Sequence, residues 1–133
     1  MSDLMGKVKN KYVAVDLDGT LAEYDGWSGL DNIEDPKPHA RICMRILEKA
    51  GFNLIIYTCR ADRGLKKVRD WLETHRIPYD HINFNPEQHE TAGEKKLFAH
   101  YYIDDRNGSF QDLFSSVKKV LDKEGINTVK IRG

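Results

Sequence analysis

The chain has 133 residues, which is enough for one compact domain with a buried core and too few for two. Lysine plus arginine and aspartate plus glutamate number 21 each, and this balance disfavours a long nucleic-acid partner without excluding one. No apolar run approaches membrane-spanning length, and two distant cysteines with no preceding signal segment favour reduced thiols in a cytoplasmic protein.

The first predicted element is a strand over Tyr12–Val15, which follows a polar lead-in over residues 1–10. This strand runs directly into Asp16 and Asp18, two carboxylates one residue apart, and then into Gly19. Charges at the end of an apolar strand are costly unless a partner holds them, and glycine lets the chain turn sharply. The pattern indicates a cation site that needs a further acid. An acidic turn without a ligand is the alternative, and it needs no partner.

A long connection follows from Leu21 to Lys37, without a clear period and with five acidic residues. It also carries Tyr24 and Trp27. One interpretation is a flap over a site. The other is a loop that Tyr24 and Trp27 pin to the core, and the sequence leaves both open.

The rest of the chain alternates predicted helices and strands. Proline and glycine signals and apolar spacing predict helices from Pro38 to Gly51, over Arg63–Thr74, over Gly93–His100 and over Phe110–Lys123. The first of these is expected to bury Ile42, Met44, Ile46 and Leu47. The further predicted strands are Leu54–Tyr57, Ile82–Phe84, Tyr101–Ile103 and Ile126–Ile131.

This alternation favours a single α/β domain over residues 1–133, with a mainly parallel five-stranded sheet and helices on both faces. In such a sheet, the loops that leave the carboxyl ends of the strands line one crevice. Three polar clusters fall on those loops: Asp16 with Asp18, Thr58-Cys59-Arg60, and Asp104-Asp105-Arg106.

Four carboxylates in one crevice would repel one another strongly unless a divalent cation neutralised them. Ligands that are all oxygen suit Mg²⁺ better than zinc. The sequence therefore predicts a magnesium site formed by Asp16, Asp18, Asp104 and Asp105.

Four ordered pieces of the sequence resemble the motifs of the haloacid dehalogenase (HAD) superfamily of phosphohydrolases. These are Asp16-Leu17-Asp18-Gly19-Thr20, Thr58, a lysine within Gly93-Glu94-Lys95-Lys96, and Asp104-Asp105. The resemblance covers nearly the whole chain and implies a three-layer Rossmann-like fold with the first and fourth strands adjacent. Because the insertions are short at both usual places, the chain resembles the small members that lack a cap domain.

The resemblance also implies roles. Asp16 would attack phosphorus to form an aspartyl-phosphate, Asp18 would act as general acid and base, and Thr58 would donate a hydrogen bond to the phosphoryl group. The lysine would neutralise a phosphoryl oxygen, and we prefer Lys96 to Lys95 because it directly precedes the apolar Leu97-Phe98. Asp18 would meet the metal through its backbone carbonyl. Which of Asp104 and Asp105 binds Mg²⁺ directly is left open.

Residues next to the motif positions are candidates for contact with the substrate: Gly19, Thr20, Cys59 and Arg60. Arg60 and Arg106 are explained equally well by ion pairs with nearby carboxylates. Cys59 has no base at a usable spacing, so a small buried residue is favoured over a nucleophile.

These features predict a magnesium-dependent phosphatase that acts on a phosphate monoester, with a nucleotide or a sugar phosphate as the favoured small-molecule substrate. Without a cap domain, either a bulky substrate enters the site or a neighbouring subunit closes it. The sequence therefore leaves open whether the protein forms a homo-oligomer. Two alternatives remain: a polynucleotide end phosphatase of the same fold, and a non-catalytic regulatory module that binds magnesium or phosphate.

Overall fold

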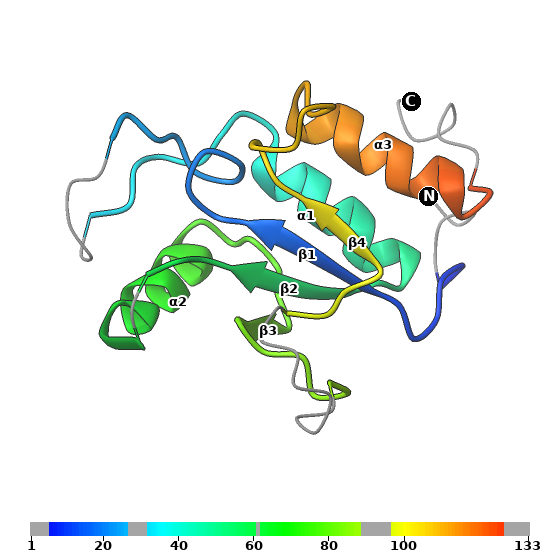
Figure 1. Ribbon diagram of the computed structural model, residues 1–133, viewed down its shortest axis with the longest axis horizontal. Coiled ribbons are helices and arrows are strands. Elements are labelled where there is room, and N and C mark those ends of the chain that lie inside the picture. The colour runs from blue at the N-terminus through cyan, green and yellow to red at the C-terminus, as the bar shows by residue number, and fades with distance from the viewer. Residues whose placement is uncertain (1–5, 27–31, 61, 89–96, 127–133) are drawn as a thin grey trace.

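The computed structural model describes residues 6–26, 32–60, 62–88 and 97–126 (Figure 1). Within these ranges, one parallel sheet has the strand order β3-β2-β1-β4. The strands are β1 (Tyr12–Asp16), β2 (Asn53–Tyr57), β3 (His81–Ile82) and β4 (Tyr101–Ile103). The helices are α1 (Ala40–Ala50), the short 3₁₀ helix η1 (Asp62–Gly64), α2 (Leu65–Thr74) and α3 (Leu113–Lys123). The predicted adjacency of the first and fourth strands is confirmed.

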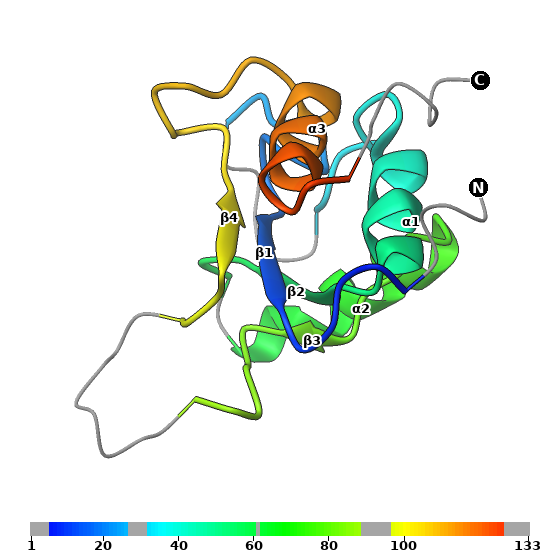
Figure 2. The same ribbon diagram turned by 90° about the vertical axis from the view of Figure 1, so that its right-hand side faces the viewer.

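The main core lies on one face of the sheet. Alternate residues of β1 and β2 point to this face and pack with buried side chains from all three α-helices. The strand residues in this core are Val13, Val15, Leu54 and Ile56. A smaller cluster on the opposite face joins Tyr12, Ala14 and Ile55 to Ala99. Figure 2 shows α1 and α3 together on one side of the strands.

The described residues do not show the predicted helices on both faces. A helix over Gly93–His100 was expected, but Leu97–His100 is not helical, and residues 93–96 lie outside the described ranges. The described part of the sheet has four strands rather than the predicted five. Of the expected strand Ile126–Ile131, Ile126 is not in a strand and the rest lies outside the described residues.

The position of α3 differs from the predicted arrangement with helices on both faces of the sheet. α3 packs beside α1, on the face that the crossover from β1 to β2 uses. A crossover from β4 to a strand at its outer edge would run in the direction opposite to the crossover from β1 to β2. To be right-handed, it would need its helix on the other face of the sheet. α3 is therefore not placed as the helix of such a crossover.

Local chemistry explains where two of the helices begin and end. α1 stops at Gly51, which has φ +108° and leaves room for the Val8 carbonyl oxygen, only 2.0 Å from where a Cβ would lie. α3 begins after Asp112 rather than at the predicted Phe110, because the Asp112 carboxylate accepts a hydrogen bond from the Ser115 amide at 2.7 Å.

The buried stripe of α1 differs in one position from the prediction. Ile42 was expected in the core and is 52% exposed. Residues at helical spacing around it form the stripe instead: Ala40, Cys43, Met44, Ile46, Leu47 and Ala50. Ile42 lies on the outer side of the helix.

Hydrogen bonds fix the long connection between β1 and α1. The Trp71 indole of α2 donates to the Glu34 carbonyl at 2.9 Å, and the Glu23 amide donates to the Asp35 carbonyl at 2.8 Å. Tyr24 is 48% exposed and does not pin this connection to the core. Trp27 lies outside the described residues.

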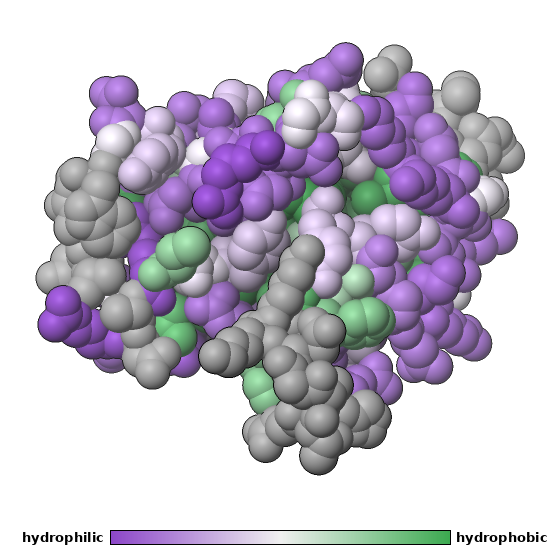
Figure 3. Space-filling view, in the orientation of Figure 1, coloured by the Kyte–Doolittle hydropathy of each residue, from purple (hydrophilic) through white to green (hydrophobic). Residues whose placement is uncertain are grey.

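The surface in Figure 3 is mostly hydrophilic, with small separate hydrophobic areas. Five large apolar side chains are exposed among the described residues: Tyr24, Ile42, Phe84, Phe98 and Tyr102. None of the helices that the structure describes has the length and apolar character needed to cross a membrane.

Candidate active site

A tight turn at the carboxyl end of β1 prepares the site. The Leu17 carbonyl accepts hydrogen bonds from the amides of Thr20, Leu21 and Ala22 at 3.3, 3.0 and 2.9 Å. Gly19 has φ +87° in this turn, and a Cβ there would lie 2.4 Å from Oδ2 of Asp105. Only glycine satisfies both the backbone conformation and the approach of Asp105.

Three of the four predicted acids meet at the carboxyl edge of the sheet. Asp16, Asp104 and Asp105 each offer a carboxylate oxygen, and these oxygens lie within 4.8 Å of one another. They meet because β1 and β4 are neighbours, which brings the ends of the two strands together. A donor set of carboxylate oxygens alone fits Mg²⁺, which these three residues would hold.

Burial and repulsion act on Asp16. It is 7% exposed, and burial followed by the charges of Asp104 and Asp105 raises its pKa to about 7. Burial also opposes ionisation of Asp104, but hydrogen bonds from the Arg106 amide, the Tyr57 hydroxyl and the Arg106 side chain lower its pKa to about 2. When no cation is bound, Asp104 is thus ionised at neutral pH and Asp16 is only about half ionised.

Thr20 links the ends of β1 and β4. Its hydroxyl lies 3.4 Å from Oδ2 of Asp16 and 3.3 Å from Oδ1 of Asp105, and it accepts a hydrogen bond from the Asp105 amide at 3.0 Å. Thr20 is only 1% exposed. Thr20 thus lies between the acids, and its contact with substrate stays a prediction.

The Asp18 side chain is not in the acidic group. Both of its oxygens accept hydrogen bonds from Arg60, from Nε at 3.1 Å and from Nη2 at 2.9 Å. The Arg60 side chain is 3% exposed, and it also donates to the Asn32 carbonyl at 3.0 Å. The ion-pair interpretation of Arg60 is confirmed. The predicted metal contact of Asp18 uses its backbone carbonyl, and the side-chain arrangement does not test it.

Thr58 is buried and follows Tyr57, the register partner of Asp16. Asn83 fixes its backbone: the Thr58 amide donates to Oδ1 of Asn83 at 2.9 Å, and Nδ2 of Asn83 donates to the Thr58 carbonyl at 3.0 Å. Asn83 has φ +53°, a conformation that asparagine tolerates better than most residues. The sequence analysis missed Asn83 because it placed this residue inside a strand.

Tyr57 is a second residue that the sequence analysis missed. Its hydroxyl donates a hydrogen bond of 2.7 Å to Oδ2 of Asp104. Arg106 reaches the same carboxylate, with Nη2 at 3.3 Å from Oδ2 and its amide at 2.9 Å from Oδ1. Arg106 therefore pairs with Asp104, as the ion-pair interpretation expected.

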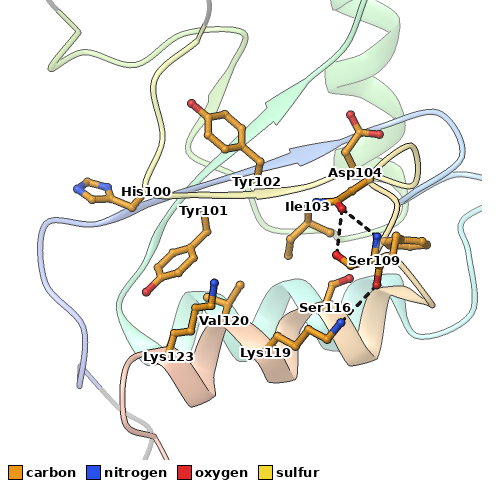
Figure 4. A pocket seen from close by; sticks show the side chains of 12 residues that line it. His100, Tyr101, Tyr102, Ile103, Asp104, Ser109, Ser116, Lys119, Val120 and Lys123 are labelled. Atoms are coloured by element: carbon orange, nitrogen blue, oxygen red, sulfur yellow. Dashed lines mark hydrogen bonds between the residues drawn. The ribbon is translucent and has the colours of Figure 1, made fainter.

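A cavity of about 320 Å³ lies between β4 and α3 (Figure 4). Tyr101 and Ile103 point from β4 toward α3, where Lys119 and Lys123 also border the cavity, whereas the Asp104 side chain points away. The cavity thus lies on the helical side of β4. The carboxylates of the acids lie at the edge of the opposite face, and Asp104 is the one acid of the group that also borders the cavity.

The comparison with protein families decides the assignment. A family model described as "PITM 1-3, LNS2 domain" matches residues 13–130. The chain belongs to this family. The LNS2 (Lipin/Ned1/Smp2) domain has a HAD-like phosphatase fold, which agrees with the superfamily that the sequence motifs resemble. That the chain is of the small type without a cap domain stays a prediction.

Solved structures resemble this LNS2 domain to different degrees. A conserved protein from Bacteroides thetaiotaomicron matches with a TM-score of 0.69 and 24% identity, over 92% of this chain and 98% of that one, and shows the shared fold. A protein from Vibrio cholerae has 25% identity and a TM-score of 0.47, over 86% of this chain and 98% of that one. A chain of the Pnkp1/Rnl/Hen1 RNA repair complex has 16% identity and a TM-score of 0.47, over 87% of this chain and 32% of that one. No curated protein sequence matches the domain.

Two predictions for the LNS2 domain concern residues near these motifs. Cys59 is exposed rather than buried, although it lies beside the buried Thr58. The choice between Lys95 and Lys96 falls outside the described residues.

Proposed function

We propose that this chain is a magnesium-dependent phosphatase that hydrolyses a phosphate monoester through an aspartyl-phosphate on Asp16. A nucleotide or a sugar phosphate is the favoured substrate class. The observation that carries the proposal is the meeting of Asp16, Asp104 and Asp105 within 4.8 Å, at the ends of two adjacent strands. The HAD-like phosphatase fold of the family supports it.

Asp16 is the nucleophile in this proposal. One of its carboxylate oxygens forms a bond to phosphorus while the bond from phosphorus to the leaving oxygen breaks, and water then hydrolyses the resulting acyl phosphate. Bound Mg²⁺ supplies charge neutralisation between the carboxylates and the phosphoryl oxygens. Burial keeps Asp16 in one orientation, and its carboxyl group must be ionised to attack.

Asp18 is proposed as the group that gives a proton to the leaving oxygen and later takes one from water. Both of its oxygens accept hydrogen bonds from Arg60 in the structure. Proton transfer therefore requires Arg60 to give up at least one of these contacts when substrate binds. Thr58 and Lys96 are proposed to bind the phosphoryl oxygens.

The contact between Arg60 and Asp18 favours a second candidate function. A carboxylate with both oxygens committed to a buried guanidinium is suited to holding a loop in place rather than to moving protons. In this candidate, the chain binds magnesium or a phosphate group without turnover and serves as a regulatory module.

Phosphate release from p-nitrophenyl phosphate tests the proposal. With Mg²⁺, the wild-type chain is expected to release phosphate, and Asp16→Asn is expected to reduce the rate by at least about a thousandfold. Asp70→Asn is the matched control, because Asp70 is an exposed carboxylate on α2 that pairs only with Lys66 among the described contacts. EDTA should stop the wild-type reaction.

Equal rates for the wild-type chain and Asp16→Asn would contradict the proposed mechanism. Binding of Mg²⁺ without phosphate release by the wild-type chain would favour the regulatory module. A panel of phosphorylated metabolites and an oligonucleotide with a terminal phosphate would then separate small substrates from polynucleotide ends, for which affinity should fall with added salt.

The free thiols Cys43 and Cys59 support our proposal of a cytoplasmic protein.

A further inference from the structure

Tyr57, Asp16 and Asp104 form a row across the carboxyl edge of the sheet. Asp16 pairs in register with Tyr57 of β2. On the other side, Val15 pairs with Ile103 of β4, so Asp104 lies level with Asp16. Neighbouring strands are about 4.8 Å apart, which separates the backbones of Tyr57 and Asp104 by about 10 Å. The three residues also point to the same face, because alternate strand residues share a face.

The Tyr57 side chain spans this distance over the nucleophile strand. Its hydroxyl donates to Oδ2 of Asp104 at 2.7 Å. A tyrosine hydroxyl ordinarily keeps its proton at neutral pH, and here its short hydrogen bond makes Oδ2 of Asp104 the acceptor. A tyrosine at this position is therefore a permanent donor to Asp104.

We propose that Tyr57 is a positioning residue that holds the Asp104 carboxylate in the orientation needed to bind Mg²⁺ beside Asp16. The proposal rests on the metal site of the proposed function. Among the described residues, two side chains donate hydrogen bonds to Asp104, and of these Tyr57 is half-buried and its bond is short. Arg106 is exposed, and its side-chain contacts are 3.3 and 3.4 Å long. An exposed ion pair of that kind restrains a carboxylate little.

The restraint matters because repulsion acts on Asp104. The carboxylate oxygens of Asp16, Asp104 and Asp105 lie within 4.8 Å of one another, so an unrestrained Asp104 would turn away from the group. Partners that orient metal ligands commonly contribute about ten- to a hundredfold to metal affinity. The Tyr57 hydroxyl holds Oδ2 of Asp104, and together with the Arg106 amide on Oδ1 it restrains rotation of the carboxylate.

Tyr57→Phe removes the hydroxyl and keeps the ring. Folding should survive, because Asp104 keeps its contacts with Arg106. Tyr79→Phe is the matched control, since the Tyr79 hydroxyl donates to Glu73 at an exposed position outside the site. Mn²⁺ is titrated into the full-length chain, free Mn²⁺ is measured by electron paramagnetic resonance, and Mg²⁺ is added as competitor.

Tyr57→Phe should weaken binding of both cations by about tenfold, and Tyr79→Phe should bind like the wild type. In the phosphatase assay, Tyr57→Phe should need about tenfold more Mg²⁺ for half-maximal rate but reach nearly the wild-type kcat at saturation. If Tyr57 had a purely structural role, Tyr57→Phe would lower thermal stability in EDTA, and it would not raise the Mg²⁺ requirement while leaving kcat unchanged.

Wild-type cation affinity in Tyr57→Phe would overturn the proposal even if the chain is an active phosphatase. Absence of cation binding by the wild-type chain would overturn it together with the metal site. Weakened binding in Tyr57→Phe, with no phosphate release by any variant, would support the role of Tyr57 and reject only the phosphatase.

Discussion

At the scale of single residues, the position of Gly19 requires glycine for two reasons, backbone conformation and the approach of Asp105, and experiments can separate them. Its φ of +87° strains any other residue, and Oδ2 of Asp105 lies 2.4 Å from where a Cβ would stand. Gly26 has a similar φ of +98°, but nothing lies within 4 Å of its Cβ position. The two glycines therefore share a positive φ but differ in whether the Asp105 carboxylate is in the way.

Gly26→Ala is expected to lower the free energy of unfolding by about 1 kcal/mol through strain alone. Gly19→Ala should lower it by at least as much and should also displace Asp105, so that Mn²⁺ binding weakens in this variant only. Urea unfolding in EDTA and Mn²⁺ titration measure the two effects. Unchanged Mn²⁺ affinity in Gly19→Ala would show that Asp105 is not needed at the site.

The sequence predicted the acids of the site because local signals mark them. Asp16 and Asp104 each end an apolar strand, and strand ends in a parallel sheet share one edge. Tyr57 and Asn83 were missed because their function depends on partners in other strands. A tyrosine at the end of a strand looks like a packing residue until the strand order places an acid within its reach.

At the scale of elements, the predicted helix over Gly93–His100 was wrong for its described part because tertiary partners satisfy the backbone. The Phe98 amide donates to Oε1 of Gln88, and the Phe98 carbonyl accepts from Nδ2 of Asn85. The Tyr102 hydroxyl donates to the Leu97 carbonyl and accepts from the Ala99 amide. These contacts replace helical hydrogen bonds, and no local pattern shows them in advance.

The connection between β1 and α1 also depends on a distant partner, the Trp71 indole on the Glu34 carbonyl. Trp71→Phe should loosen the two arms of this connection. Amide exchange of Glu23 and Lys37, which donate to Asp35 and Leu21, should rise about fivefold, as expected for a hydrogen bond worth about 1 kcal/mol.

The amides of β1 provide the internal control for this experiment, because they belong to the sheet and not to the connection. Hydrogen exchange followed by NMR resolves both sets. A uniform rise in β1 and the connection would mean that Trp71→Phe destabilises the whole protein. No rise at Glu23 and Lys37 would show that the connection is fixed by its other contacts.

At the scale of the whole molecule, the acidic group links stability to pH. Asp16 has a pKa of about 7 in the folded chain, compared with 3.8 as its ordinary value. The folded state therefore binds this proton more tightly than the unfolded state does. That contribution to stability is complete below about pH 4 and is lost as the pH rises through about 7. Asp104 has its pKa lowered to about 2, so its own contribution stays constant above about pH 4.

Without metal, raising the pH from 5 to 8 should lower the free energy of unfolding of the wild type by a few kcal/mol, on the order expected for this pKa difference. Asp16→Asn removes the titrating group and should flatten this dependence. At pH 8, saturating Mg²⁺ should restore wild-type stability, because a cation that binds only the folded state stabilises it and offsets the repulsion. Urea unfolding at the two pH values, with EDTA or with Mg²⁺, measures each step. The same pH dependence in the wild type and in Asp16→Asn would show that the neighbouring carboxylates do not raise the pKa of Asp16. It would also contradict the close approach of the acids on which the shared cation site depends.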